Sequence, residues 1–433
     1  MDPRPPLYSF DYPVPGYSSE PRVDEERLEY QQARWQESET RPTGIFLRQN
    51  NGITIILNHQ EDKATNPIFR QRSNIEGTLT VDVPESVSDV TLKLSGSIEV
   101  VSPTVGWMSI EVLNQKYTLF KSDSDDSRTT PSYCPSSLQF SCPLPRTFQH
   151  DGKEYPLPPS YYILLPGETH SLAYYVKCTY TFVAITSKTR SRHTAFLGKN
   201  KKANSFIFEY LPRWRPPRPV IDRSLLSTIR ICPGEWRRFS YQVVPKLDKP
   251  QLGSLTCLFF LPSVGVFGIT DSIRFHVQIV GPRASLSQLQ PGSSSSSSEH
   301  LSSQVERAHD QTSGNLERQT SIRVHLMRQV VIEKNGHKNA VHLFLGEAKL
   351  SPLPPVEGTL SLEGLEQRQD DNSNWEGELR CESEARPTFS AGAVTVMDFV
   401  VLELSKGYAS LFHPFKHGHP VRLVSDSWKD AGR

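Results

Sequence analysis

The sequence predicts an all-β protein with two immunoglobulin-like antiparallel β-sandwich domains. Apolar and polar residues alternate with a period of two in both parts of the chain, and turn residues, without helical patterns, separate these segments. A proline-rich stretch divides the two sets of strands. With 433 residues, the chain has room for two or three domains of about 150 residues each.

The expected strands follow one another along the chain. Each alternating segment has one face for a core and one for water, as in an antiparallel sheet. The clearest are 78–83, 90–95, 176–182, 273–279 and 322–326, and 394–404 is a last, mostly apolar run.

Composition changes mark the domain boundaries. Polar and proline-rich segments cannot bury enough apolar surface to fold alone, so they predict a disordered tail and a disordered loop insertion. Residues 121–132 are expected to form a polar loop. The predicted parts are a disordered tail (1–42), a first sandwich (43–210), a linker (211–221), a second sandwich (222–425) with a disordered insertion (283–320), and a C-terminal tail (426–433).

Charge and cysteine content narrow the function classes. The net charge of +1 argues against binding nucleic acid by bulk charge. The start of the chain lacks the pattern of a secretory signal, and the six scattered cysteines include no Cys-x-x-Cys pair, so we expect reduced thiols and a cytoplasmic protein.

No catalytic motif is found in the sequence. Phosphate-binding loops, nucleophile elbows and His-Glu-x-x-His are all missing, so we expect no enzyme activity and no cofactor. His413, His417 and His419 cluster without a nearby cysteine or carboxylate, and we interpret them as loop residues and not metal ligands. Cys134 and Cys142 lack zinc-knuckle spacing and are expected to be a loop thiol and a buried strand thiol.

Six segments follow one another in a characteristic order. They are 138–145, 157–161, 174–185 and 206–213 in the first part, and 271–279 and 389–402 in the second. In this order they resemble the arrestin-like family, specifically the alpha-arrestins or arrestin-related trafficking adaptors. The resemblance covers about residues 43–425, and it implies two immunoglobulin-like sandwiches and an adaptor instead of an enzyme.

The tail contains Pro5-Pro6-Leu7-Tyr8, the Pro-Pro-x-Tyr form that WW domains bind. Consecutive prolines preset a polyproline II conformation, so little entropy is lost on binding. The prediction is that Pro5, Pro6 and Tyr8 bind a WW-containing HECT-type ubiquitin ligase. An inert tail is the alternative. Many family members carry such motifs after the second domain, whereas this sequence places the copy in its N-terminal tail.

A second match, Pro158-Pro159-Ser160-Tyr161, lies between two expected strands. It coincides with a structural Leu-Pro-Pro-Ser segment of the family. Pro158, Pro159 and Tyr161 are therefore expected to be structural and not to bind a WW domain.

The third feature is a basic segment from Lys188 to Lys202, which holds six lysines and arginines and no acid. Such a local positive field attracts acidic tails or anionic lipid. The candidate contacts are Lys188, Arg190, Arg192, Lys199, Lys201 and Lys202. A solvated strand connection explains the same residues equally well. One aromatic residue, Phe196, gives no stacking platform for nucleic acid.

From these features we expect a cytoplasmic adaptor that associates peripherally with the plasma membrane or endosomes. It would recognise cytosolic tails of membrane transporters or receptors and recruit the ligase for ubiquitin-dependent endocytosis and sorting. Two alternatives stay open: a ligase-independent structural subunit of an endosomal sorting coat, and an enzyme or sugar-binding module on a β-sandwich. Whether the tail motif binds a ligase distinguishes the adaptor from the coat subunit.

Overall fold

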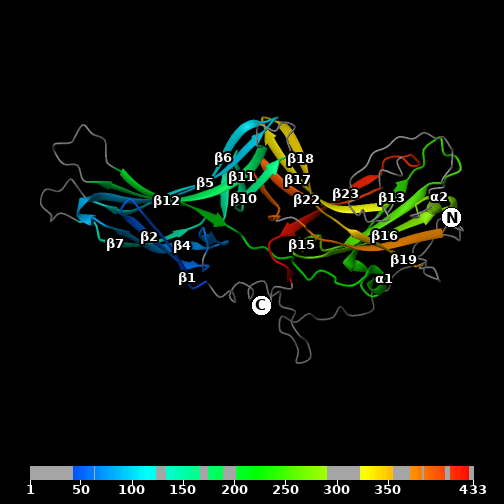
Figure 1. Cartoon of the computed structure of the whole chain (residues 1–433), viewed down its shortest axis with the longest axis horizontal. Coiled ribbons are helices and arrows are strands. Elements are labelled where there is room, and N and C mark those ends of the chain that lie inside the picture. The colour runs from blue at the N-terminus through cyan, green and yellow to red at the C-terminus, as the bar shows by residue number, and fades with distance from the viewer. Residues whose placement is uncertain are drawn as a thin grey trace, which may run out of the picture. The chain divides into compact units, whose positions relative to one another are not determined.

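The computed structural model confirms a nearly all-β chain in which two pairs of sheets form two sandwich-like halves (Figure 1). It describes residues 42–62, 64–122, 133–165, 174–188, 201–289, 322–354, 371–382, 385–404 and 410–428.

The first half pairs a four-stranded sheet with a six-stranded one. The smaller sheet has the order β1 (Gly44–Asn50), β2 (Ile53–Gln60), β4 (Asn74–Val81), β7 (Ser137–Pro143). The larger has the order β3 (Ile68–Phe69), β12 (Lys201–Tyr210), β11 (Tyr174–Lys188), β5 (Val87–Ser102), β6 (Gly106–Lys121), with β10 (Tyr161–Leu165) also paired to β11. β8 (Thr147–His150) and β9 (Lys153–Pro156) form a separate hairpin.

The second half repeats this plan with a five-stranded and a six-stranded sheet. One has the order β13 (Trp236–Val243), β14 (Leu255–Pro262), β16 (Ile273–Gly281), β20 (Asp371–Leu379), β19 (Lys349–Leu353). The other has the order β15 (Val266–Gly268), β23 (Lys416–Val424), β22 (Val394–Leu404), β17 (Ile322–Lys334), β18 (His337–Glu347), with β21 (Phe389–Ala391) also paired to β22. The described residues add two short helices, α1 (Leu225–Thr228) and α2 (Arg283–Gln288), and two 3-10 turns, Pro84–Ser86 and Pro233–Glu235.

The alternation in the sequence corresponds to real burial. In β11, Val176, Cys178, Tyr180 and Phe182 are buried while the residues between them are only partly covered. Tyr180 is central to this core, because its ring occupies the space beside Gly96, where an added Cβ would lie 2.6 Å from the ring. Only glycine, which has no Cβ, lets β5 and β11 pack this closely at Gly96.

One strand, β17, belongs to the cores of both halves. Val324 and Leu326 pack in the core of the second half, whereas Val330 and Ile332 pack in the core of the first. β22 follows the same course, since Val396 joins the first core. The halves are therefore tied by shared apolar packing and not by the linker alone.

The linker 211–221 contains no helix or strand, as its prolines require. It is nevertheless fixed to the end of the second half. The Arg213 guanidinium donates to both carboxylate oxygens of Asp426 at 2.6–3.0 Å, and the Trp214 amide donates to the Ser425 hydroxyl at 2.8 Å.

The structure differs from prediction at the start of the expected insertion. Residues 283–288 form α2, and Leu286 and Leu289 are buried in the second core, so this part is ordered by apolar packing. Residues 290–321, the tail 1–41 and residues 123–132 of the polar loop lie outside the described residues. No helix in the part that the structure describes is long and apolar enough to span a bilayer.

Candidate protein-binding surface

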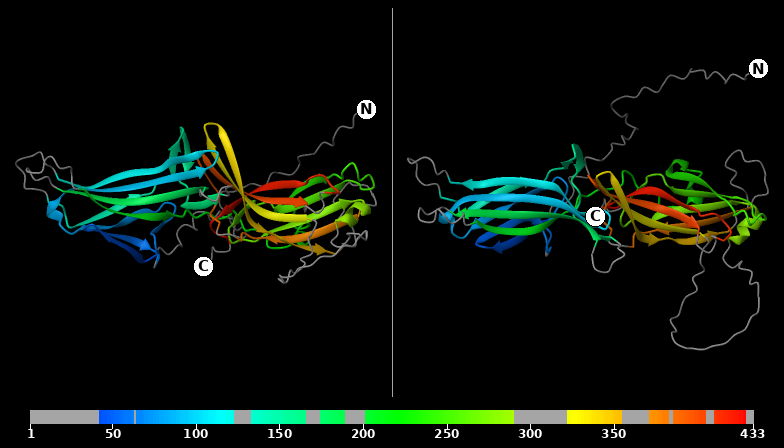
Figure 2. Two further views of the ribbon diagram at one scale, coloured as in Figure 1. Left: turned by 45° about the horizontal axis from the view of Figure 1, so that its top comes forward. Right: turned by 90° about the horizontal axis from the view of Figure 1, so that it is seen from above.

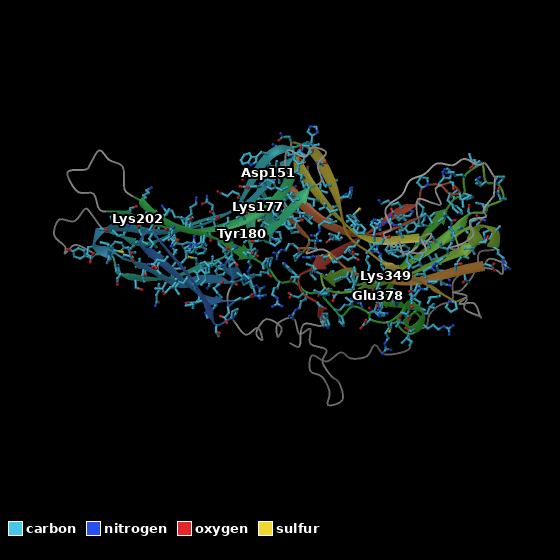
Figure 3. All side chains as sticks on the ribbon, in the orientation of Figure 1. Asp151, Lys177, Tyr180, Lys202, Lys349 and Glu378 are labelled. Atoms are coloured by element: carbon cyan, nitrogen blue, oxygen red, sulfur yellow. The ribbon has the colours of Figure 1, made fainter. Side chains whose placement is uncertain are left out.

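The tail motif cannot be placed, because Pro5, Pro6 and Tyr8 lie outside the described residues. Most of the basic segment does as well: residues 189–200 lie outside, and only the backbone of Lys188 is described. Lys201 and Lys202 are described, and both are exposed at the start of β12, where Figure 3 labels Lys202.

The second Pro-Pro-x-Tyr copy is buried. Pro158 and Pro159 are covered, and Tyr161 is 3% exposed. The Tyr180 hydroxyl donates a hydrogen bond to the Pro158 carbonyl at 2.5 Å, and the Tyr161 ring meets Phe389 edge-on at 5.1 Å. Burial raises the pKa of the Tyr161 hydroxyl, and neighbouring Arg328 opposes this rise. A WW domain would have to unfold this segment to reach it.

A buried ion pair lies beside Tyr161. Arg328 on β17 and Asp398 on β22 are direct cross-strand partners, 1% and 0% exposed at their side chains. The guanidinium donates to the two carboxylate oxygens at 2.8 and 2.9 Å, and also to the Arg386 carbonyl at 2.6 Å. Burial alone would lower the pKa of Arg328, but the hydrogen bonds and charge of Asp398 raise it, so the guanidinium stays charged. Burial raises the pKa of the Asp398 carboxyl, and Arg328 opposes this rise.

Contacts around this pair join the two halves. Arg386 lies 3.7 Å from the Glu209 carboxylate of β12. The Lys334 ammonium, at the end of β17, donates to the carbonyls of Val105 and Trp107 at 3.1 and 3.2 Å. The β5–β6 and β17–β18 hairpins thus lie side by side, as their ends show in Figure 2.

An exposed apolar row crosses the larger sheet of the first half next to this junction. Strand register places its four side chains in line on one sheet face, because directly paired residues point to the same side. The apolar row consists of Leu164 (β10), Tyr175 (β11), Val101 (β5) and Trp107 (β6). The two ends of the row are the exposed part, with Trp107 66% and Leu164 55% exposed, whereas Tyr175 and Val101 between them are half-buried.

The next position along the sheet extends this surface. Tyr162, 58% exposed, pairs with Lys177 and lies 6.1 Å from the Tyr175 ring. Lys177 lies on β11, three residues before the core residue Tyr180, and Figure 3 labels both. Protein-binding surfaces are typically rich in exposed aromatic side chains with a cationic residue beside them. This surface can therefore bind an apolar segment of a partner protein.

Two clefts lie elsewhere. One, of about 500 Å³, crosses the outer face of β16, β20 and β19 in the second half and is mixed in charge. Its floor holds the cross-strand row Arg274, Glu378 and Lys349, of which Figure 3 labels the last two. The other, of about 410 Å³, lies over β4 and β7 in the first half and is lined by amides, hydroxyls and Glu76.

Two of the three clustered histidines lie in a strand and not in a loop, which corrects the sequence interpretation for them, while His413 lies outside the helices and strands as expected. His417 and His419 lie in β23 and pack on aromatic rings: His417 stacks on Tyr241 at 3.7 Å, and His419 lies 4.1 Å from Phe239. Burial lowers the pKa of His419 to about 4. Among the residues described, no group of three or more His, Cys, Asp or Glu has metal-binding geometry.

The two cysteines considered for zinc are both buried. Cys142 lies in β7, and burial raises the pKa of its thiol to about 11. Cys134 lies in the segment before β7. Burial raises the pKa of the Cys134 thiol as well. Thiols that stay protonated at neutral pH are weak nucleophiles.

Sequence reasoning missed the apolar row. β10 is apolar at all five positions, so its pattern predicts a strand buried on both faces, and only the register reveals the exposed side. A scan against models of protein families found no match for this chain, and neither did a search of curated proteins.

Proposed function

We propose that this chain is an arrestin-like adaptor that binds the cytosolic parts of membrane cargo and recruits a WW-containing HECT-type ubiquitin ligase. The observation that carries the proposal is the apolar row on a body of two sandwich-like halves. Such a surface offers a cargo segment an apolar contact, while the tail offers the ligase Pro5-Pro6-Leu7-Tyr8.

The buried second copy supports a division of labour between the two motifs. Because Tyr161 is buried and packed against Phe389, we assign ligase binding to the tail copy and not to this one. A single WW contact is weak, on the order of −8 kcal/mol at a micromolar Kd. Stable recruitment would then depend on several WW domains or on clustering at a membrane.

A pulldown of the full chain with the WW domains of a HECT-type ligase tests the proposal. Tyr8→Ala should remove most of the association without changing the melting temperature. Tyr12→Ala, in the same tail but outside the motif, is the matched control and should bind like the wild type. Tyr161→Ala should lower stability yet keep ligase binding while folded.

The cargo part has its own readout. Trp107→Ala combined with Leu164→Ala should keep ligase binding and abolish cargo ubiquitylation in a reconstituted reaction. If the wild-type chain does not bind the WW domains, the adaptor proposal fails and a ligase-independent coat subunit explains the fold better. If Tyr8→Ala leaves ligase binding intact, the proposed role of the tail motif is wrong.

A further inference from the structure

We propose that the segment around α1 and the start of β13 in the second half docks on an anionic lipid membrane. We define this arginine surface as Arg223, Arg230, Ile231 and Arg238. The inference goes beyond the proposed adaptor function, because it requires neither the tail motif nor the apolar row.

Charge is concentrated in this part of the chain. Residues 211–243 contain seven arginines, no lysine and two acids, so their net charge is +5 (7 − 2), in a chain whose total is +1. Both acids are already engaged: Glu235 pairs with Arg218, and Asp222 lies 3.6 Å from Arg274. The cleft beside α1 adds further acids, among them Glu376, Glu378 and Glu382. Within the described ranges none of these five acids forms an ion pair with an arginine of the arginine surface.

The three arginines of the surface are open to solvent. Arg223, Arg230 and Arg238 are exposed, and within the described ranges none forms an ion pair. Guanidinium groups bind phosphate oxygens in a forked geometry, which suits the headgroups of acidic lipids.

Local packing holds these side chains on one surface. The Trp236 indole donates to the Thr228 hydroxyl at 2.9 Å, and Trp236 shares a small buried cluster with Leu225 and Phe260, outside the main core. This cluster fixes α1 against the start of β13. Arg223 and Arg230 flank α1, and Arg238 follows Trp236 by two residues on the same face of the strand.

An apolar side chain points out from the same loop. Ile231, directly after Arg230, is 78% exposed. Surfaces that lie on membranes combine basic residues at headgroup level with apolar residues that enter the interface. An acidic peptide would engage the arginines but leave Ile231 in water. Nucleic acid would lack a stacking platform, since Trp236 is buried.

Cosedimentation of the full chain with phosphatidylcholine vesicles, with and without phosphatidylserine, tests the proposal. Binding should require phosphatidylserine. Arg230→Gln with Arg238→Gln should weaken partitioning about 30-fold, because each basic residue contributes about fivefold near an anionic surface. The matched control is Lys93→Gln with Lys116→Gln, an exposed cross-strand pair in the first half, which should bind like the wild type.

A second pair of variants tests the apolar contact. Ile231→Ser should lose the part of the binding that resists high salt, whereas Leu247→Ser, a 97% exposed leucine in another loop, should not. The proposal is wrong if the wild type ignores phosphatidylserine or if the lysine control weakens binding as much as the arginine variant. It is also wrong if soluble polyglutamate displaces the protein and Ile231→Ser has no effect, which would indicate an acidic-peptide surface. None of these outcomes depends on ligase binding.

Discussion

Removing one partner of the buried ion pair should destabilise the protein strongly. In Asp398→Asn, the Arg328 guanidinium stays 1% exposed but loses its counter-charge and one of two carboxylate acceptors. Breaking a fully buried pair in this way costs about 3–5 kcal/mol. The Arg386 carbonyl still accepts one hydrogen bond, so the lower end, about 3 kcal/mol, is expected for this isosteric change.

The matched control is an exposed ion pair between Arg323 on the same strand, β17, and Glu347 on β18. The Arg323 guanidinium contacts Glu347 at 2.7 and 2.8 Å, but both side chains are more than a third exposed. Glu347→Gln should therefore cost at most about 1 kcal/mol. Urea unfolding monitored by tryptophan fluorescence measures both variants. Equal shifts of the unfolding midpoint for Asp398→Asn and Glu347→Gln would refute the reasoning.

Two further predictions concern the interior. Burial lowers the pKa of His419 from 6.5 to about 4 in the folded protein. As the pH falls, the unfolded chain therefore binds this proton before the folded protein does. The stability present above pH 6.5 is lost as the pH falls through 4. At pH 4.5 the loss attributable to His419 is about 2–3 kcal/mol, and His419→Phe should flatten the pH profile of the urea midpoint by that amount; an unchanged profile would contradict the burial. Gly96→Ala should cost about 1–3 kcal/mol in the same assay by driving a methyl group against the Tyr180 ring, whereas Gly234→Ala, with nothing within 4 Å, should be nearly neutral.

The period-two patterns predicted the strands well, because burial of one sheet face produces the alternation of apolar and polar residues. The run from Val394 to Leu404 has the bounds of β22, and the alternating residues of β16 are buried as expected. The expected strand around residue 80 ends sooner, at Val81, because Val83 is 55% exposed before a 3-10 turn. Local sequence indicates which residues alternate, but not where tertiary packing stops supporting them.

Where the prediction failed, non-local packing decided the outcome. Gly418 and Pro420 predict a loop, yet β23 forms because β22 supplies a full antiparallel partner. On the other side, β15 pairs only with residues 422–424, so Pro420, which has no amide hydrogen, leaves no bond unmade. The contact of Arg328 with Asp398 joins residues 70 apart, and its pairing depends on register that no local pattern contains.

β17 links the packing of the two halves to the proposed binding surface. Along one strand, Leu326 is buried in the second core, Arg328 meets Asp398 at the junction, and Val330 enters the first core. Its end reaches the first half through Lys334, which holds the backbone carbonyl of Trp107, the most exposed member of the apolar row. A partner docked on the row would therefore contact a residue whose backbone is fixed by the second half. Lys334→Met would loosen this link while leaving both cores intact, so weaker cargo binding with unchanged ligase binding would locate the coupling at the junction.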